Sequence, residues 1–126
     1  MIDARNEDER IAALKFAADD GQAEAMFLLG VSYAQGKGVE RDDTAAARWF
    51  HQAAKRGHAR ARTSMGYLYS IGKGVRHDVI LGFLFLTQAS ELGDLLARDL
   101  LARLRKQMNA AQLREAEKRV RERAVD

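Results

Sequence analysis

Apolar residues recur every three or four positions along most of the chain, the spacing of helices that bury one face. Between Ala23 and Gln35 they fall at positions 25, 26, 29 and 33, and before Arg56 at positions 46, 49, 50 and 53. The segment GKGV at 36–39 separates the two runs, and glycine tolerates the left-handed turn that ends a helix. Asp42 or Asp43 can cap the second run. The pattern predicts a helical hairpin.

This hairpin occurs twice. Residues i and i+36 are identical at 12 of 36 positions when the stretch starting at Gly21 is aligned with the stretch starting at Gly57. The second copy predicts helices from Ala59 to Ile71 and from Val79 to Glu91, the latter capped by Asp78. A fixed period in this range is typical of stacked helix pairs. We therefore predict an all-α fold, a right-handed α–α superhelix (a solenoid of antiparallel helix pairs) with about seven helices.

The two ends of the chain are predicted to cap the stack. Residues 11–21 overlay the second helix of a repeat, in a helix expected from about Glu7 to Asp19 and opened by a capping box of Asn6 and Glu9. After Gly93 a leucine-rich helix follows without a GKGV turn, and a second capping box opens a last helix that runs to about Arg123. That box consists of Asn109 and Gln112. We expect one domain over residues 1–126, divided into a cap (1–21), two repeats (22–57 and 58–93) and a degenerate C-terminal repeat (94–126).

Composition narrows the class of protein. Hydrophobic residues make up 47% and charged residues 31% of the 126 positions, an ordinary globular balance. The absence of cysteine excludes disulfides and thiolate metal sites. The first residues are acidic where a signal peptide needs basic ones, and the longest apolar run, Val79 to Leu86, has eight residues against about 20 for a membrane span. We expect a cytoplasmic protein without a membrane span.

The sequence contains no pattern typical of catalysis or of ligand binding. Five residues separate Gly30 from Gly36, where a phosphate loop has four, and Gly38 stands where that loop needs Ser or Thr. The three histidines lack partners at metal-ligand spacing, and the serines lack a nucleophile elbow. We therefore expect no catalytic residues, no metal, no cofactor and no enzymatic activity.

Charge is unevenly distributed. Residues 1–27 hold seven acids and three bases, whereas residues 44–77 hold seven bases and no acid. The basic segment, 48–76, forms either solvated helix faces or a surface for nucleic acid or another acidic partner. Of these partners, nucleic acid is the less favoured.

The repeat resembles the Sel-one-like repeat (SLR) family, an α-solenoid family related to tetratricopeptide repeats. The matching letters of the first copy are AxA from 23, LGxxY from 29, GKGV from 36, Asp42, AxxWF from 46 and AAxxG from 53. The second copy departs at Met65, Gly82, Phe85, Leu86 and Ser90. The resemblance implies an adaptor or scaffold that binds proteins and performs no reaction, in a family common in bacteria.

In the related tetratricopeptide geometry the first helix of each pair lines a concave groove. Counting from the shared glycine and tyrosine positions predicts groove residues Glu24, Phe27, Val31, Ala34 and Gln35 in copy one, and Arg60, Thr63, Tyr67, Ser70 and Ile71 in copy two. Aromatic residues and arginine are typical anchors of interfaces. The alternative is that these side chains contact neighbouring helices.

A second candidate surface lies on the second helix of copy two. Ile80, Leu81 and Leu84 stand where copy one has Thr44, Ala45 and Arg48. An apolar patch of this kind marks a contact surface. Either the last helix covers it through Leu113 and Val120, or a second copy does in a homodimer.

Overall fold

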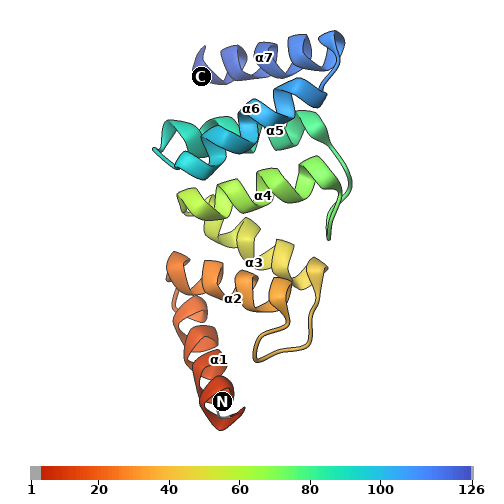
Figure 1. The fold of residues 1–126 in the computed structure, drawn as a ribbon. Coiled ribbons are helices and arrows are strands. Elements are labelled where there is room, and N and C mark those ends of the chain that lie inside the picture. The colour runs from red at the N-terminus through yellow and green to blue at the C-terminus, as the bar shows by residue number, and fades with distance from the viewer. Residues whose placement is uncertain (1–3, 126) are drawn as a thin grey trace.

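The structure, a computed structural model, describes residues 4–125 and contains seven α-helices and no strand in that range (Figure 1). The helices stack one after another from the N-terminal to the C-terminal end, which confirms the predicted all-α superhelix. In each repeat the first helix has the predicted bounds, and the second helix begins directly after a predicted capping aspartate. The helices are α1 (Ala4–Asp19), α2 (Ala23–Gln35), α3 (Asp43–Lys55), α4 (Ala59–Ile71), α5 (Val79–Glu91), α6 (Leu95–Gln107) and α7 (Ala110–Val125).

The two predicted capping boxes have different outcomes. The box at Asn6 is wrong, because α1 already begins at Ala4 and Asn6 lies within its first turn. Alanine and arginine, which precede Asn6, favour a helix more than asparagine does, so the helix extends past it. The box at Asn109 is confirmed: its Oδ1 accepts from the Gln112 amide at 2.8 Å, and Gln112 Oε1 accepts from the Asn109 amide at 3.0 Å.

The turn inside each hairpin has the same construction in both repeats. Gly36 and Gly72 adopt left-handed φ angles of 69° and 70° and end α2 and α4. The Asp42 carboxylate accepts a hydrogen bond from the Ala45 amide at 3.0 Å and so caps the start of α3. The Asp78 carboxylate accepts from the Leu81 amide at 3.0 Å and caps the start of α5 in the same way. The identical letters of the two copies therefore set the helix ends.

Each GKGV turn rests on the second helix of the preceding hairpin. A Cβ at Gly38 would lie 2.9 Å from Ile11 Cγ1 of α1, and a Cβ at Gly74 would meet the Asp43 carbonyl of α3. Both glycines have positive φ angles, 79° and 73°. The turn of the first repeat thus packs on α1 in the same way as the turn of the second repeat packs on α3.

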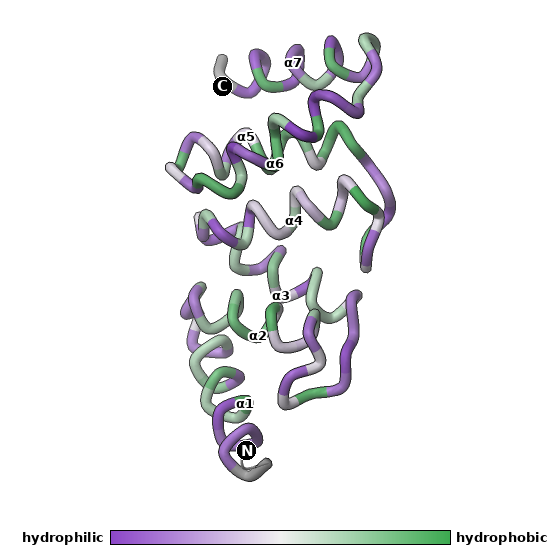
Figure 2. The backbone as a smooth tube through the Cα atoms, in the orientation of Figure 1, coloured by the Kyte–Doolittle hydropathy of each residue, from purple (hydrophilic) through white to green (hydrophobic). Residues whose placement is uncertain are grey.

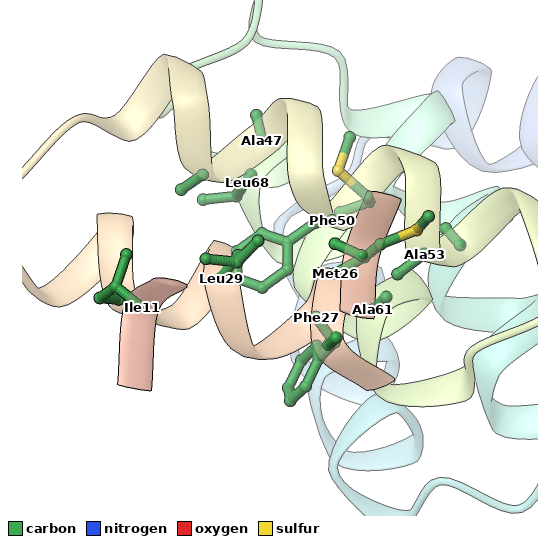
Figure 3. Packing of buried hydrophobic residues seen from close by; sticks show 14 residues of the cluster. Ile11, Met26, Phe27, Leu29, Ala47, Phe50, Ala53, Ala61 and Leu68 are labelled. Atoms are coloured by element: carbon green, nitrogen blue, oxygen red, sulfur yellow. The ribbon is translucent and has the colours of Figure 1, made fainter. Parts of the chain in front are cut away.

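The core consists of two clusters. The first extends from Ile11 of α1 to Leu68 of α4, with Leu29 and Phe50 meeting near its centre (Figure 3). The second joins α5, α6 and α7 around Phe83 and Leu104. α5 is hydrophobic over most of its length (Figure 2), and it packs against α4, α6 and α7. The superhelix therefore buries its most apolar helix on three sides.

The apolar patch on α5 is partly covered from within the chain. Ile80 packs in the second cluster together with Leu113 and Val120 of α7. Leu81 and Leu84 are half-buried. This packing is consistent with the intramolecular alternative for Ile80, and the homodimer through this patch stays a prediction.

The repeated glycine of the first helices has a different neighbour in each copy. A Cβ at Gly30 would lie 2.6 Å from the Phe50 ring. A Cβ at Gly66 would lie 2.6 Å from Leu86 Cγ and 3.1 Å from the Gly82 carbonyl oxygen. A backbone thus approaches closely at Gly66, where α4 and α5 come together, whereas an aromatic ring does so at Gly30.

Candidate protein-interaction surface

An apolar groove runs across α4, between α2 and α6, with a volume of about 380 Å³. Phe50, Ala46 and Leu68, all buried, form its floor. Tyr67 and Leu96 stand at its rim and are 46% and 58% exposed. The remaining lining residues are Ala34, Asp43, Thr63, Ser64, Lys73 and Leu100. We call this hollow the α4 groove.

The structure divides the groove residues predicted from the sequence. Ala34, Thr63 and Tyr67 line the α4 groove. Ile71 is exposed one turn beyond Tyr67, and Gln35 is exposed at the end of α2. The others point elsewhere or are partly covered: Val31 packs against the first core cluster, and the Ser70 hydroxyl donates to the Tyr67 carbonyl at 2.7 Å.

Phe27 is part of the contact between the repeats. Its side chain is 5% exposed and stacks on His58, with 4.7 Å between ring centroids. Arg60 Cζ lies 5.1 Å from the Phe27 centroid. His58 Nδ1 accepts from the Ala61 amide at 3.1 Å, so Nε2 carries the proton and donates to Glu24 at 2.7 Å. A partner cannot reach Phe27 without opening this cluster.

Thr63 occupies the equivalent place in the second repeat. It is buried, and its hydroxyl bonds to the carboxylate of Asp94. Asp94 is the N-cap of α6, as His58 is the N-cap of α4. Thr63 and Asp94 are therefore the counterparts, 36 residues further along, of Phe27 and His58, and they make the equivalent contact. The contact after the first repeat is a stacked pair of rings, and the contact after the second repeat is a hydrogen bond.

Replacing Thr63 with valine should lower the free energy of unfolding by about 1 kcal/mol, because valine has the same shape but leaves the Asp94 carboxylate without this donor. Urea denaturation followed by circular dichroism measures the change. Ser64→Ala is the control, since the Ser64 hydroxyl donates to the Arg60 carbonyl of its own helix at 3.0 Å. Equal effects of the two substitutions would show that the bond between the repeats contributes nothing.

The basic segment does not form one face. Arg60 lies over Phe27, Arg62 Nε donates to the Ala54 carbonyl at 3.2 Å, and Lys73 lines the α4 groove. Arg48 borders a separate hollow between α3 and α4, next to Met65. The binding of nucleic acid by residues 48–76 stays a prediction.

Two kinds of site are missing from the described part of the chain. Residues 4–125 hold no group of three or more histidine, aspartate or glutamate side chains placed to bind a metal ion. No helix among them combines the length and apolarity that a bilayer crossing requires.

Both hairpins match one family model. The Sel1 repeat model covers residues 23–58 and 59–94, more than half of the chain. The chain belongs to the Sel1 repeat family. Sel1 repeat proteins are generally scaffolds for protein–protein interactions and are typically not catalytic. The family resemblance drawn from the sequence is thereby confirmed.

Three solved structures show the same fold. Over 85% of this chain, c5321, a protective antigen of uropathogenic Escherichia coli with an SLR fold, is 32% identical with a TM-score of 0.81. A Sel1 repeat protein from Oxalobacter formigenes is 37% identical over 72% of the chain, with a TM-score of 0.70. Helicobacter pylori cysteine rich protein B is 25% identical over 72% of the chain, with a TM-score of 0.69.

The lengths of these proteins differ from that of this chain. The match covers 23% of c5321, 26% of the Oxalobacter protein and 68% of the Helicobacter protein. This chain thus spans about a quarter of the first two. Among functionally curated proteins, no sequence matches it.

Two residues of the α4 groove lie outside both Sel1 matches. Leu96 and Leu100 belong to α6, whereas the second match ends at residue 94. Leu96 and Leu100 lie 36 residues after Arg60 and Ser64, so the repeat period, continued by one more copy, predicts them. Sequence reasoning missed them because it stopped counting groove positions where the GKGV turn stops recurring.

Proposed function

We propose that the protein is a non-enzymatic scaffold that holds a segment of a partner protein in the α4 groove. The observation that carries the proposal is the combination of a buried apolar floor with an exposed rim of Tyr67 and Leu96. A hollow of this kind accepts apolar side chains, and tyrosine is a frequent anchor at interfaces. Family membership supports a protein as the partner.

The polar groups of the groove support binding over catalysis. The Thr63 hydroxyl is engaged by Asp94, and the Ser64 hydroxyl by the Arg60 carbonyl. Asp43 lies 3.6 Å from Arg41, measured between carboxylate oxygen and guanidinium nitrogen. The Thr63 and Ser64 hydroxyls are therefore taken up by contacts of the fold.

Replacing both Tyr67 and Leu96 with alanine should reduce partner retention at least about tenfold, because together they supply the exposed apolar rim. The measurement is affinity purification from the source cells with quantitative mass spectrometry. Phe27 is left unchanged because its removal would disturb the contact between the repeats.

Leu95→Ala is the matched control for this experiment. Leu95 is 75% exposed, lies next to Leu96 in α6, and does not line the α4 groove. It should leave retention unchanged, and helical circular dichroism should be the same in all variants. Proteins retained equally by the double variant and the parent chain would rule out the groove as the binding site.

A further inference from the structure

Among the side chains whose exposure the structure describes (residues 6–123), the most exposed large apolar one is Phe16 of α1, at 80% exposure. Helical spacing places Ala12 and Ala13 on its face, and both are exposed. Exposed acidic residues lie at both ends of this apolar stripe, Glu9 at one end and Asp19 and Asp20 at the other, and the exposed Lys15 lies beside Phe16. We call this surface of α1 the Phe16 face.

The Phe16 face cannot be covered by the α4 groove of its own chain. α1 lies at one end of the stack and packs against α2 (Figure 1). Phe16 is absent from the first core cluster, which takes Ile11 and Ala18 from α1. The stripe and the groove are therefore both open on the same molecule.

The two surfaces are complementary in shape and in charge. The α4 groove is apolar, and a ring the size of benzene fits a cavity of roughly 150 Å³. Lys73 lines the groove and Arg60 is exposed in the first turn of α4. Of the acids nearby, Asp43 lies by Arg41, Asp99 pairs with Arg103 at 3.1 Å, and the Asp94 carboxylate bonds to the Thr63 hydroxyl. The groove therefore favours an acidic occupant with one aromatic side chain.

We propose that copies of this chain associate head to tail, with Phe16 of one copy in the α4 groove of the next. The carboxylates of the Phe16 face then lie toward Lys73 and Arg60. The inference rests on the proposed function in one respect, since it uses the same groove: self-association and partner binding compete. Because the two surfaces differ, such a contact leaves one surface of each kind free at the ends and permits further growth.

Sedimentation equilibrium of the full chain tests the proposal at concentrations up to about 1 mM, which populates an interface with a Kd of about 100 μM. The parent chain should exceed its monomer mass of 14.1 kDa as concentration rises. Phe16→Ala and Leu96→Asp should each remain monomeric, because one removes the inserted ring and the other places an acid at the groove rim.

Mixing the two variants distinguishes this geometry from a symmetric dimer. The Phe16→Ala chain keeps an intact groove and the Leu96→Asp chain keeps an intact Phe16 face, so an equimolar mixture should form a 1:1 dimer that grows no further. A mixture that stays monomeric would overturn the proposal, as would self-association of either variant at the level of the parent chain. A partner protein that binds the Phe16 face instead would give a monomeric parent chain, which also overturns it.

Partner retention separates the failure of this proposal from the failure of the proposed function. Phe16→Ala should retain as much partner as the parent chain or more, because the competing occupant is gone, whereas Leu96→Asp should lose it. If the parent chain is monomeric but the Leu96→Asp chain retains less partner protein than the parent chain, head-to-tail association is wrong and the proposed function stands. If all chains retain partner equally, the proposed function fails on its own.

Discussion

Replacing Gly82 with valine should lower the free energy of unfolding by about 3 kcal/mol, a large effect for one substitution. A Cβ at Gly82 would lie 2.9 Å from the Gly66 carbonyl oxygen and 3.2 Å from the Ser70 amide nitrogen. Both are backbone atoms of α4, so the clash cannot be relieved by rotating a side chain. The helices α4 and α5 must move apart, and the packing of α4 on α3 and of α5 on α6 and α7 weakens as a result.

Thermal unfolding followed by circular dichroism measures this effect, and the midpoint should fall by about 10 °C. Ala102→Val is the control, because Ala102 is exposed in the middle of α6 and the change there costs only the difference in helix propensity. A Gly82 variant as stable as the control would mean that the two helices do not approach as closely as the structure has them.

Replacing Phe50 with alanine should cost about 3 to 5 kcal/mol, a large part of the stability of a typical domain. The Phe50 ring is buried, fills the space left by Gly30, and lies 5.6 Å from Phe27 between ring centroids. Its loss opens a cavity in the first core cluster. Because Phe50 also forms part of the floor of the α4 groove, the variant should lose partner retention at temperatures where it remains folded.

Chemical denaturation of the Phe50 variant tests the first part of this expectation. Phe16→Ala is the matched control, since it deletes the same side chain from an exposed position and should change stability by no more than about 0.5 kcal/mol. Similar losses from the two substitutions would contradict the packing described for Phe50.

Several of the groove residues predicted from the sequence differ between the two copies, and the structure shows why such a difference does not by itself mark a binding position. Phe27 and Thr63 differ because their neighbours in the next repeat differ, His58 in one case and Asp94 in the other. A comparison of the two copies shows variation at each position but not which varying positions touch. The contacts of Phe27 with His58 and of Thr63 with Asp94 join residues 31 positions apart, so only the three-dimensional structure shows them.

Identical letters can also hide different causes. Gly30 leaves room for the ring of Phe50, whereas Gly66 leaves room for Leu86 and for the backbone of α5 at Gly82. The substitution of glycine for Ala46 in the second copy looks like a departure from the family pattern. In space, Gly66 and Gly82 face each other and permit the close crossing of α4 and α5.

The period can be read from the aligned sequence alone. The sequence by itself also determined the helix bounds of both repeats and the caps at Asp78 and Asn109, and it narrowed the cap of α3 to Asp42 or Asp43, because these features depend on residues within four positions of one another. Tertiary structure alone decided which exposed residues form a surface. Tyr67, Leu96 and the buried Phe50 come from three different helices, and Phe27 leaves the surface for the contact between the repeats. A groove is a property of the distances between helices, and those distances follow from the packing of side chains far apart in the chain.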